Sequence, residues 1–172
     1  MNTSRGGIQR GIFLVLFVLI LLGAFYSILD RGVGMNKIPP HSALITIHNT
    51  PDSLAYTSVS YMAELATTEE EQTKGLGGRQ SLALGTGMLF VFPEPGSYGF
   101  WMKDTLIPLD MIWIAADKHI VTIAKDVQPS SYPSVYSPDE EAQYVLEVSA
   151  GEAEKNHFAV GDTVSFTSSE LH

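Results

Sequence analysis

The feature that most constrains this chain is an uncharged run near its N-terminus, residues 11–29, which reads GIFLVLFVLILLGAFYSIL. A bilayer core about 30 Å thick needs about 20 consecutive apolar residues in a helix, and the run has about that length. It is apolar on every side, whereas a helix at the surface of a soluble core would be amphipathic. We therefore expect residues 11–29 to form a transmembrane anchor.

The charges that flank this run predict its orientation. Arg5 and Arg10 precede it, and the positive-inside rule then keeps residues 1–10 in the cytoplasm. The rest of this single-pass protein would lie outside the cytoplasmic membrane, in a periplasmic or extracellular position. A cleaved signal peptide is the alternative, but its apolar stretch is normally about 7–15 residues long and ends in a small-x-small site. Here Leu22 takes the place of the first small residue in Leu22-Gly23-Ala24.

Residues 30–42, DRGVGMNKIPPHS, have the composition of a linker. Glycine and proline resist regular structure, and the adjacent Pro39 and Pro40 favour a stiff, extended segment. The linker separates the anchor from residues 43–172, a length that suits one domain. The expected organisation is therefore a short cytoplasmic N-terminus, an anchor, a linker and an extracytoplasmic domain.

Charge and cysteine content exclude several classes of function. The 172-residue chain has a net charge of −9, and residues 43–172 hold six Lys or Arg against eighteen Asp or Glu, which makes −12. An acidic surface of this kind repels phosphate backbones, so we expect no nucleic-acid partner. The chain has no cysteine, which excludes disulfides, thiolate nucleophiles and thiolate metal ligands.

Short strands dominate the predicted secondary structure after the linker. Residues 43–48 and 58–65 alternate in the manner of half-buried strands, and residues 109–115 and 119–124 form a hairpin around a turn at 116–118. Further strands are expected at 88–92, 98–102, 144–148 and 163–166. Strands at this spacing, with Gly and Pro between them, predict an all-β domain of sandwich or barrel type.

One or two short helices should interrupt the strands. Thr68 precedes Glu71 by three residues, and Ser149 precedes Glu152 in the same way, which is the capping-box pattern of a helix start. The segment 127–142 is rich in Pro, Ser and Tyr and is expected to be a long loop.

No motif predicts a metal site, a cofactor or a catalytic nucleophile. The five histidines are scattered singly, whereas metal ligands usually come in pairs at short spacing. There is no Gly-x-Ser-x-Gly elbow, and Gly85-Thr86-Gly87 precedes a predicted strand, so it is not a phosphate-binding loop.

The densest group of chemically useful side chains lies in residues 100–110, FWMKDTLIPLD. Lys103 could bind an anionic group with Trp101 as a stacking platform, and Asp104 and Asp110 add two carboxylates. The alternative is purely structural. In that case the aromatic residues pack in the core or at its rim, Lys103 pairs with an acid, and Asp104 shapes a turn.

The same stretch resembles the hallmark of the bacterial and archaeal family called domain of unknown function 192. Four further blocks match in order, namely TEEEQTKGL at 68–76 followed by Arg79, GMLFVF at 87–92, YVLEV at 144–148, and VGDTV at 160–164. The resemblance covers about residues 57–166 and implies an all-β domain that is often exported or membrane-tethered, with no known activity. Two positions depart from the family pattern, because Asp104 stands where Asn is usual and Gly77 where Met is usual.

Three functions remain open from the sequence. The first is a non-catalytic binding or accessory module of the cell envelope, with a small molecule, a glycan or an envelope protein as partner. The second is a hydrolase-type enzyme that uses Asp104, Asp110 or Glu147 as acid or base, with Lys103 or Arg79 stabilising an anion. The third is a structural partner module of a membrane complex. Convergence of these five residues in one cleft would favour a site, whereas dispersed positions paired on the surface would favour the structural module.

Overall fold

The structure, a computed structural model, describes residues 38–50 and 58–171. The predicted anchor at 11–29 and most of the predicted linker lie outside the described residues. In the part of the chain that the structure describes, no helix is long and apolar enough to cross a membrane.

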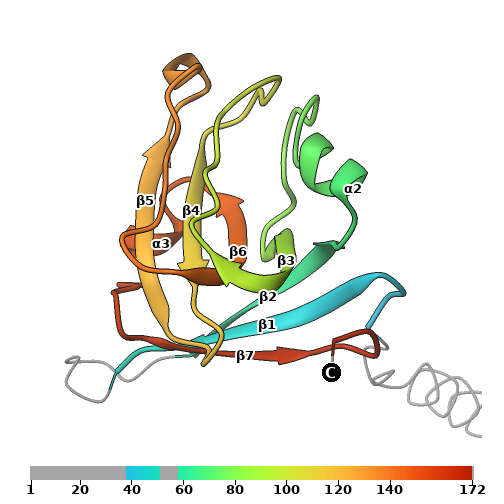
Figure 1. Ribbon diagram of the computed structural model, residues 1–172, viewed down its shortest axis with the longest axis vertical. Coiled ribbons are helices and arrows are strands. Elements are labelled where there is room, and N and C mark those ends of the chain that lie inside the picture. Colours follow the sequence, from blue (N-terminus) through green and yellow to red (C-terminus); the bar gives the residue numbers. More distant parts are fainter. Residues whose placement is uncertain (1–37, 51–57, 172) are drawn as a thin grey trace, which may run out of the picture. The chain divides into compact units, whose positions relative to one another are not determined.

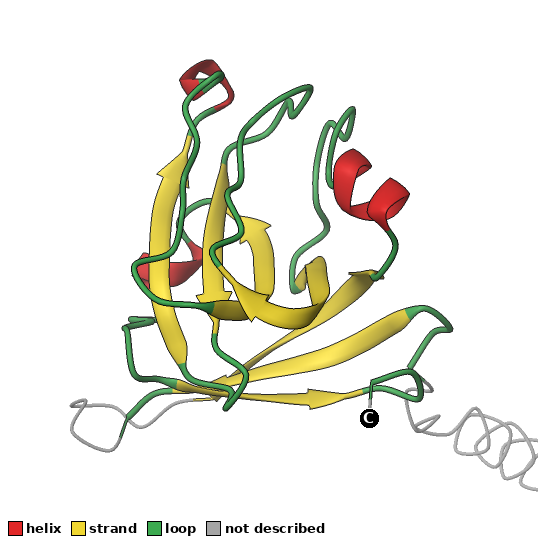
Figure 2. Cartoon of the chain, viewed as in Figure 1, coloured by secondary structure: helices red, strands yellow, loops and turns green. Residues whose placement is uncertain are grey.

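Seven strands form one mixed sheet, which confirms that the domain is mostly β (Figures 1 and 2). The strands are β1 (Ser42–His48), β2 (Ser58–Ala66), β3 (Thr86–Gly96), β4 (Leu109–Ile114), β5 (Ile120–Val127), β6 (Ala142–Ser149) and β7 (Thr163–Thr167). Their order across the sheet is β5-β4-β6-β3-β2-β1-β7. Only the β2–β3 pair is parallel, and the other pairs are antiparallel.

The sheet is curled into a half-barrel, the barrel-like form of the predicted architecture. Its first and last strands approach each other where the β4–β5 turn meets the start of β7, with an isolated bridge between His119 and Thr163. The N–H of Ile120 donates to the oxygen of Asp162 (2.9 Å), and the N–H of Val164 donates to the oxygen of Lys118 (2.8 Å). These bonds satisfy backbone groups that two free sheet edges would otherwise expose.

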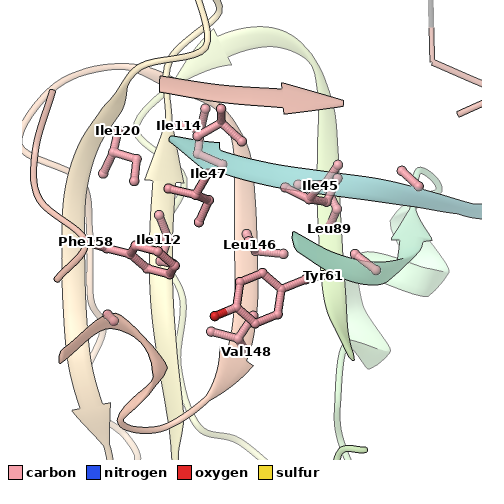
Figure 3. Close-up of a cluster of buried hydrophobic side chains, with 14 of the residues drawn as sticks. Ile45, Ile47, Tyr61, Leu89, Ile112, Ile114, Ile120, Leu146, Val148 and Phe158 are labelled. Atoms are coloured by element: carbon pink, nitrogen blue, oxygen red, sulfur yellow. The ribbon is translucent and has the colours of Figure 1, made fainter. Parts of the chain in front are cut away.

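The two faces of the sheet carry separate apolar clusters. Figure 3 shows the inner cluster, in which side chains of β1, β2, β4 and β6 meet Phe158. The outer cluster includes Phe90, Met111 and Trp113 and is packed against partly buried side chains from the connections between strands. All six residues of β4 are buried, because both of its faces are covered. The alternation predicted for β4 therefore separates two cores rather than a core and solvent.

The helices agree with the sequence at one position and differ at another. Helix α2 (Glu69–Lys74) begins with the predicted capping box, in which Thr68 accepts from the N–H of Glu71 and the Glu71 carboxylate accepts from the N–H of Thr68. Helix α3 (Glu152–Lys155) begins instead after Gly151, whose φ is +88°, and has no side-chain cap. The capping box predicted at Ser149 is therefore wrong, because Ser149 still belongs to β6.

One other predicted segment differs from the structure, and another largely agrees with it. Residues 98–102 were expected to be a strand, but they form a loop with a single bridge between Phe100 and Tyr136. The segment 127–142 is largely the predicted loop, with a short 3-10 helix, η1 (Pro129–Ser131), near its start. Figure 2 shows α2 and the loops after β3 and β5 at the same end of the sheet.

Candidate functional site

A cleft of about 630 Å³ opens on the outer face of the sheet, and we call it the α2 cleft. Helix α2, the loop between β3 and β4, and the strands β3 and β6 all contribute to its lining. The lining residues are Glu69, Gln72, Thr73, Lys74, Gly75, Leu76, Gly77, Phe90, Phe92, Tyr98, Gly99, Phe100, Trp101, Lys103, Asp104, Thr105 and Glu147.

Glu147 is the buried acid of this cleft. Its exposed fraction is 4%, and its partners in the neighbouring strands are Met88 on β3 and Met111 on β4. Neither methionine offers a strong hydrogen-bond donor, and no hydrogen bond or ion pair joins the Glu147 carboxyl to another described residue. Burial in these apolar surroundings raises the pKa of Glu147 to about 8.

The close approach of β3 and β6 explains the glycine at position 87, which pairs with Val148 next to Glu147. A Cβ at Gly87 would overlap the backbone oxygen of Glu147 and crowd the side chain of Val148. Gly87 therefore allows the backbones of β3 and β6 to pair closely beside the buried acid.

Aromatic rings form much of the cleft wall. The rings of Phe90 and Phe100 meet edge to face with centroids 4.7 Å apart, and those of Phe92 and Tyr98 are stacked at 3.6 Å. Trp101 adds a fifth aromatic residue and is 54% exposed. Packing of each ring against a neighbour holds the walls in place, which is expected of a preformed site.

The loop between β3 and β4 is attached to the rest of the domain at three points. The indole N–H of Trp113 donates to the oxygen of Tyr98 at 2.9 Å. Phe100 exchanges two backbone hydrogen bonds with Tyr136, both of 2.8 Å. The oxygen of Asp104 accepts from the N–H of Gly78, also at 2.8 Å. These bonds position the loop against α2 and the sheet.

The conformation of Asp104 gives a structural reason for its residue type. Its φ is +57°, in the left-handed region that Asn and Asp tolerate better than other side chains except Gly. Asp104, and the Asn that is usual here in the family that this stretch resembles, can therefore both adopt the left-handed backbone conformation that this position requires. The side chain of Asp104 lies in the cleft lining, where the carboxylate adds a negative charge that an amide would not.

Four of the six candidate residues from the sequence line the cleft, namely Trp101, Lys103, Asp104 and Glu147. Lys103 is exposed, and no ion pair joins it to another residue within 38–50 or 58–171. The structure thus brings a cation, two carboxyl groups and an indole to one cleft.

Asp110 lies on the opposite face of the sheet from this cleft. Its carboxylate accepts from the N–H of Asp126 at 2.8 Å and from the N–H of Ala153, at the start of α3, at 2.7 Å. The side chain is fully buried. Asp110 therefore joins β4 to β5 and α3, and it has no part in the α2 cleft.

Arg79 also lies outside the cleft lining. Its guanidinium makes a two-bond ion pair with Glu64 of β2, with one of the bonds at 2.7 Å. The hydrogen bond from Arg79 lowers the pKa of the Glu64 carboxyl. This pair attaches the segment after α2 to the sheet.

Several lining residues carried no signal in the sequence. Phe90, Phe92 and Tyr98 were predicted only as strand residues, and α2 only as a helix. The amide of Gln72 donates to the backbone oxygens of Val91 (2.9 Å) and Ala66 (3.3 Å), which holds α2 against β2 and β3. This contact, which joins residues distant in sequence, helps to place the helix as a wall of the cleft.

No group of three or more His, Asp or Glu residues suited to a metal ion occurs within the described ranges. His41 instead links two carboxylates, with Nε2 3.0 Å from Glu71 and Nδ1 3.0 Å from Glu170. Both contacts lie on the surface, and His41, Glu71 and Glu170 are not among the cleft-lining residues.

The chain is similar to two bacterial proteins of known structure. A protein of Sinorhizobium meliloti 1021, described as a "putative transcription regulator", is 31% identical with a TM-score of 0.66, over 73% of this chain and 95% of that one. A protein of unknown function from Novosphingobium aromaticivorans DSM 12444 is 29% identical with a TM-score of 0.67, over 75% of this chain and 91% of that one.

A search of curated proteins finds no match. A family model does match, over residues 47–166, which include every residue that lines the α2 cleft. Its description is DUF192, "Uncharacterized ACR". The chain belongs to the DUF192 family.

Proposed function

We propose that this protein is a non-catalytic binding module of the cell envelope that holds a small molecule in the α2 cleft. The observation that carries this proposal is Glu147, a residue only 4% exposed whose carboxyl lines that cleft and has no hydrogen-bond partner among the described residues. A buried polar group without a partner costs free energy, and folds rarely retain one without a functional reason. A ligand that reaches Glu147 would supply the missing partner.

The size and lining of the cleft favour a small molecule over the other partners. Its volume of about 630 Å³ falls within the usual range for small-molecule sites. Aromatic walls around a few polar groups are also typical of such sites. A glycan chain or an envelope protein would instead be expected on a longer groove or a broad exposed patch.

One of the three acids named for the hydrolase alternative lies outside the cleft. Asp110 is fully engaged by two backbone N–H groups on the other face of the sheet. This leaves Asp104 and Glu147 as the candidate acids that line the cleft, together with Glu69 of α2. A structural partner module, the third alternative, gives no reason for an acid buried without a partner.

A role in DNA binding is not favoured either, although one relative carries the regulator description given above. Residues 43–172 have a net charge of −12 from six basic and eighteen acidic residues. Such a surface would repel the phosphate backbone, which supplies much of the affinity in DNA binding.

The location of the protein remains part of the proposal. The uncharged run 11–29 supports a single-pass anchor, and the preceding Arg5 and Arg10 support a cytoplasmic N-terminus. The α2 cleft would then face the periplasm or the cell exterior, where it could bind a compound outside the cytoplasm.

The test is a fragment screen of the full-length chain in detergent micelles, read out by ligand-observed NMR and thermal shift. Thr73→Trp would fill part of the cleft, because Thr73 is an exposed residue of α2 in the lining. Thr167→Trp, at an exposed position on β7 outside the lining, is the matched control.

We expect fragments that bind the wild type and Thr167→Trp but not Thr73→Trp. A screen without cleft binders, or binders that Thr73→Trp retains, would contradict a ligand site in the α2 cleft. Chemical turnover of a bound fragment would contradict the non-catalytic part of the proposal alone.

A further inference from the structure

The Glu147 carboxyl needs a hydrogen-bond donor that the protein does not provide. Met88 and Met111 flank it in the neighbouring strands, and no described side chain or backbone N–H donates to it. A neutral carboxyl can donate through its O–H, whereas an ionised carboxylate only accepts, so a ligand that pairs with the ionised form must bring an N–H or O–H group.

Two lysines line the same cleft without pairing with this acid. Lys74 and Lys103 are both exposed, and neither forms an ion pair with Glu147. A metal ion is also a poor match, because it would need further oxygen or nitrogen ligands. Within 38–50 and 58–171 no group of three such acids or histidines exists.

The aromatic walls of the cleft favour a ligand with a positive charge. The face of an aromatic ring carries negative electrostatic potential and attracts a cation within about 6 Å of its centre. Phe90, Phe100 and Trp101 line the cleft together with Glu147. The rings and the Glu147 carboxylate both favour a positively charged group beside them. The exposed Lys74 and Lys103 of the same lining would favour an anion, which the benzoate probe below tests.

We propose that the α2 cleft binds a small organic cation, with an ammonium or guanidinium nitrogen against Glu147 and an apolar body between the aromatic walls. This inference rests on the proposed function and names the ligand class for the same cleft. The cation would supply the donors that Glu147 lacks and would leave its methionine neighbours in place.

Binding of this kind would release a proton. Burial raises the pKa of Glu147 to about 8, so the free acid is mostly neutral at pH 6 to 7. A cation beside it favours the ionised form, and the proton leaves to solvent as the ammonium–carboxylate pair forms. The other titratable groups of the lining are Glu69 and Lys74 of α2 and Tyr98, Lys103 and Asp104 of the loop.

The experiment is isothermal titration of the full-length chain in detergent micelles at pH 6 and pH 8. The probes are benzylammonium and phenylguanidinium, with benzyl alcohol and benzoate as the neutral and anionic probes of similar size. Glu147→Gln keeps the size of the side chain and removes its charge. Glu154→Gln, an exposed acid of α3 outside the cleft, is the matched control.

We expect at least one cation to bind, and to bind at least about tenfold more tightly than either uncharged or anionic probe, a difference of about 1.4 kcal/mol. Its affinity should rise from pH 6 to pH 8 with proton release at pH 6. Glu147→Gln should remove the preference and the pH dependence, while Glu154→Gln should behave like the wild type. A melting curve of each variant checks that it is folded.

Three results would overturn the inference. These are no binding of either cation at millimolar concentration, equal or tighter binding of benzoate or benzyl alcohol, and unchanged cation affinity in Glu147→Gln. If benzoate binds and Thr73→Trp prevents it, the cleft is still a ligand site and only the cation is wrong. If Thr73→Trp leaves all binding intact, the proposed function itself fails.

Discussion

Asp110 and Glu147 lie on adjacent strands, one register step apart, and their carboxyl groups point to opposite faces of the sheet. In the β4–β6 register Asp110 pairs with Val148, and Met111 pairs with Glu147. Asp110 accepts two backbone hydrogen bonds on the inner side, while Glu147 lines the α2 cleft without a partner. Asp110 and Glu147, both candidate site acids from the sequence, therefore have different roles. Asp110 contributes to stability, and Glu147 to the proposed binding.

Asp110→Asn should destabilise the domain without affecting the cleft. An amide can accept through its oxygen, but its NH₂ group would face one of the two N–H donors, from Asp126 or Ala153. One buried donor left unpaired costs about 1–3 kcal/mol, which lowers Tm by several degrees in a domain of this size. Thermal unfolding of the full chain measures this effect. An unchanged Tm, or loss of ligand binding in a folded variant, would contradict the assignment.

Glu147 should make the domain less stable as the pH rises from about 5 to about 8. Burial raises its pKa to about 8, so in this window the folded state keeps a proton that the unfolded state has lost. Each pH unit then removes up to about 1.4 kcal/mol of stability. Glu147→Gln should remove this slope and raise Tm most at pH 8. Parallel Tm–pH curves for the two proteins would show that Glu147 does not titrate in this way.

Truncation of the neighbours Trp101 and Met102 should lower the stability of the domain by very different amounts. Trp101 is 54% exposed and contacts Tyr132 edge to face, whereas Met102 is buried in the outer cluster. Trp101→Ala should change stability by about 0.5 kcal/mol or less, and Met102→Ala should cost about 2–5 kcal/mol. Thermal unfolding compares the two. A large loss of stability in Trp101→Ala would indicate that its indole supports the fold rather than the cleft mouth.

His41 should stabilise the domain at low pH and contribute less at high pH. Its hydrogen bond to the Glu170 carboxylate raises its pKa, with Glu71 as a second acidic neighbour. A raised pKa means that the stabilisation is complete below pH 6.5 and is lost as the pH passes the folded-state value. His41→Asn is the suitable variant, because the φ of His41 is +56° and Asn tolerates this region.

Melting curves of this variant at pH 6 and pH 9 provide the measurement. We expect a lower Tm than the wild type at pH 6 and a much smaller difference at pH 9. Equal losses at both values would assign the effect to packing or backbone conformation. The side chains are exposed, so the change should be modest.

The proposed orientation predicts which part of the chain a protease can reach. In cells stripped of their outer layers, added protease should digest the linker 30–42 or the domain and spare residues 1–10. An epitope at each end, followed by immunoblotting, measures the outcome. A domain protected until the membrane is opened would reverse the orientation.

Local sequence patterns determined much of the secondary structure. Alternating apolar residues predicted β1, β2 and the β4–β5 hairpin, because inward and outward side chains of a strand follow a period of two. The capping box at Thr68 predicted the start of α2, because its two hydrogen bonds join residues only three apart. Trp101, Lys103 and Asp104 were also predicted as candidates from their residue types and clustering, and Glu147 as a possible acid or base.

Only the tertiary structure decided which candidates share a cleft. The strand order β5-β4-β6-β3-β2-β1-β7 brings Glu147 of β6 beside β3 and β4, and no local pattern encodes that order. The register of β4 against β6 places Asp110 on the face of the sheet opposite Glu147. Arg79 forms an ion pair with Glu64 of β2. These outcomes depend on hydrogen bonds between residues far apart in sequence. The sequence by itself therefore determined most of the strands and the candidate side chains, whereas long-range pairing decided their neighbours and exposure.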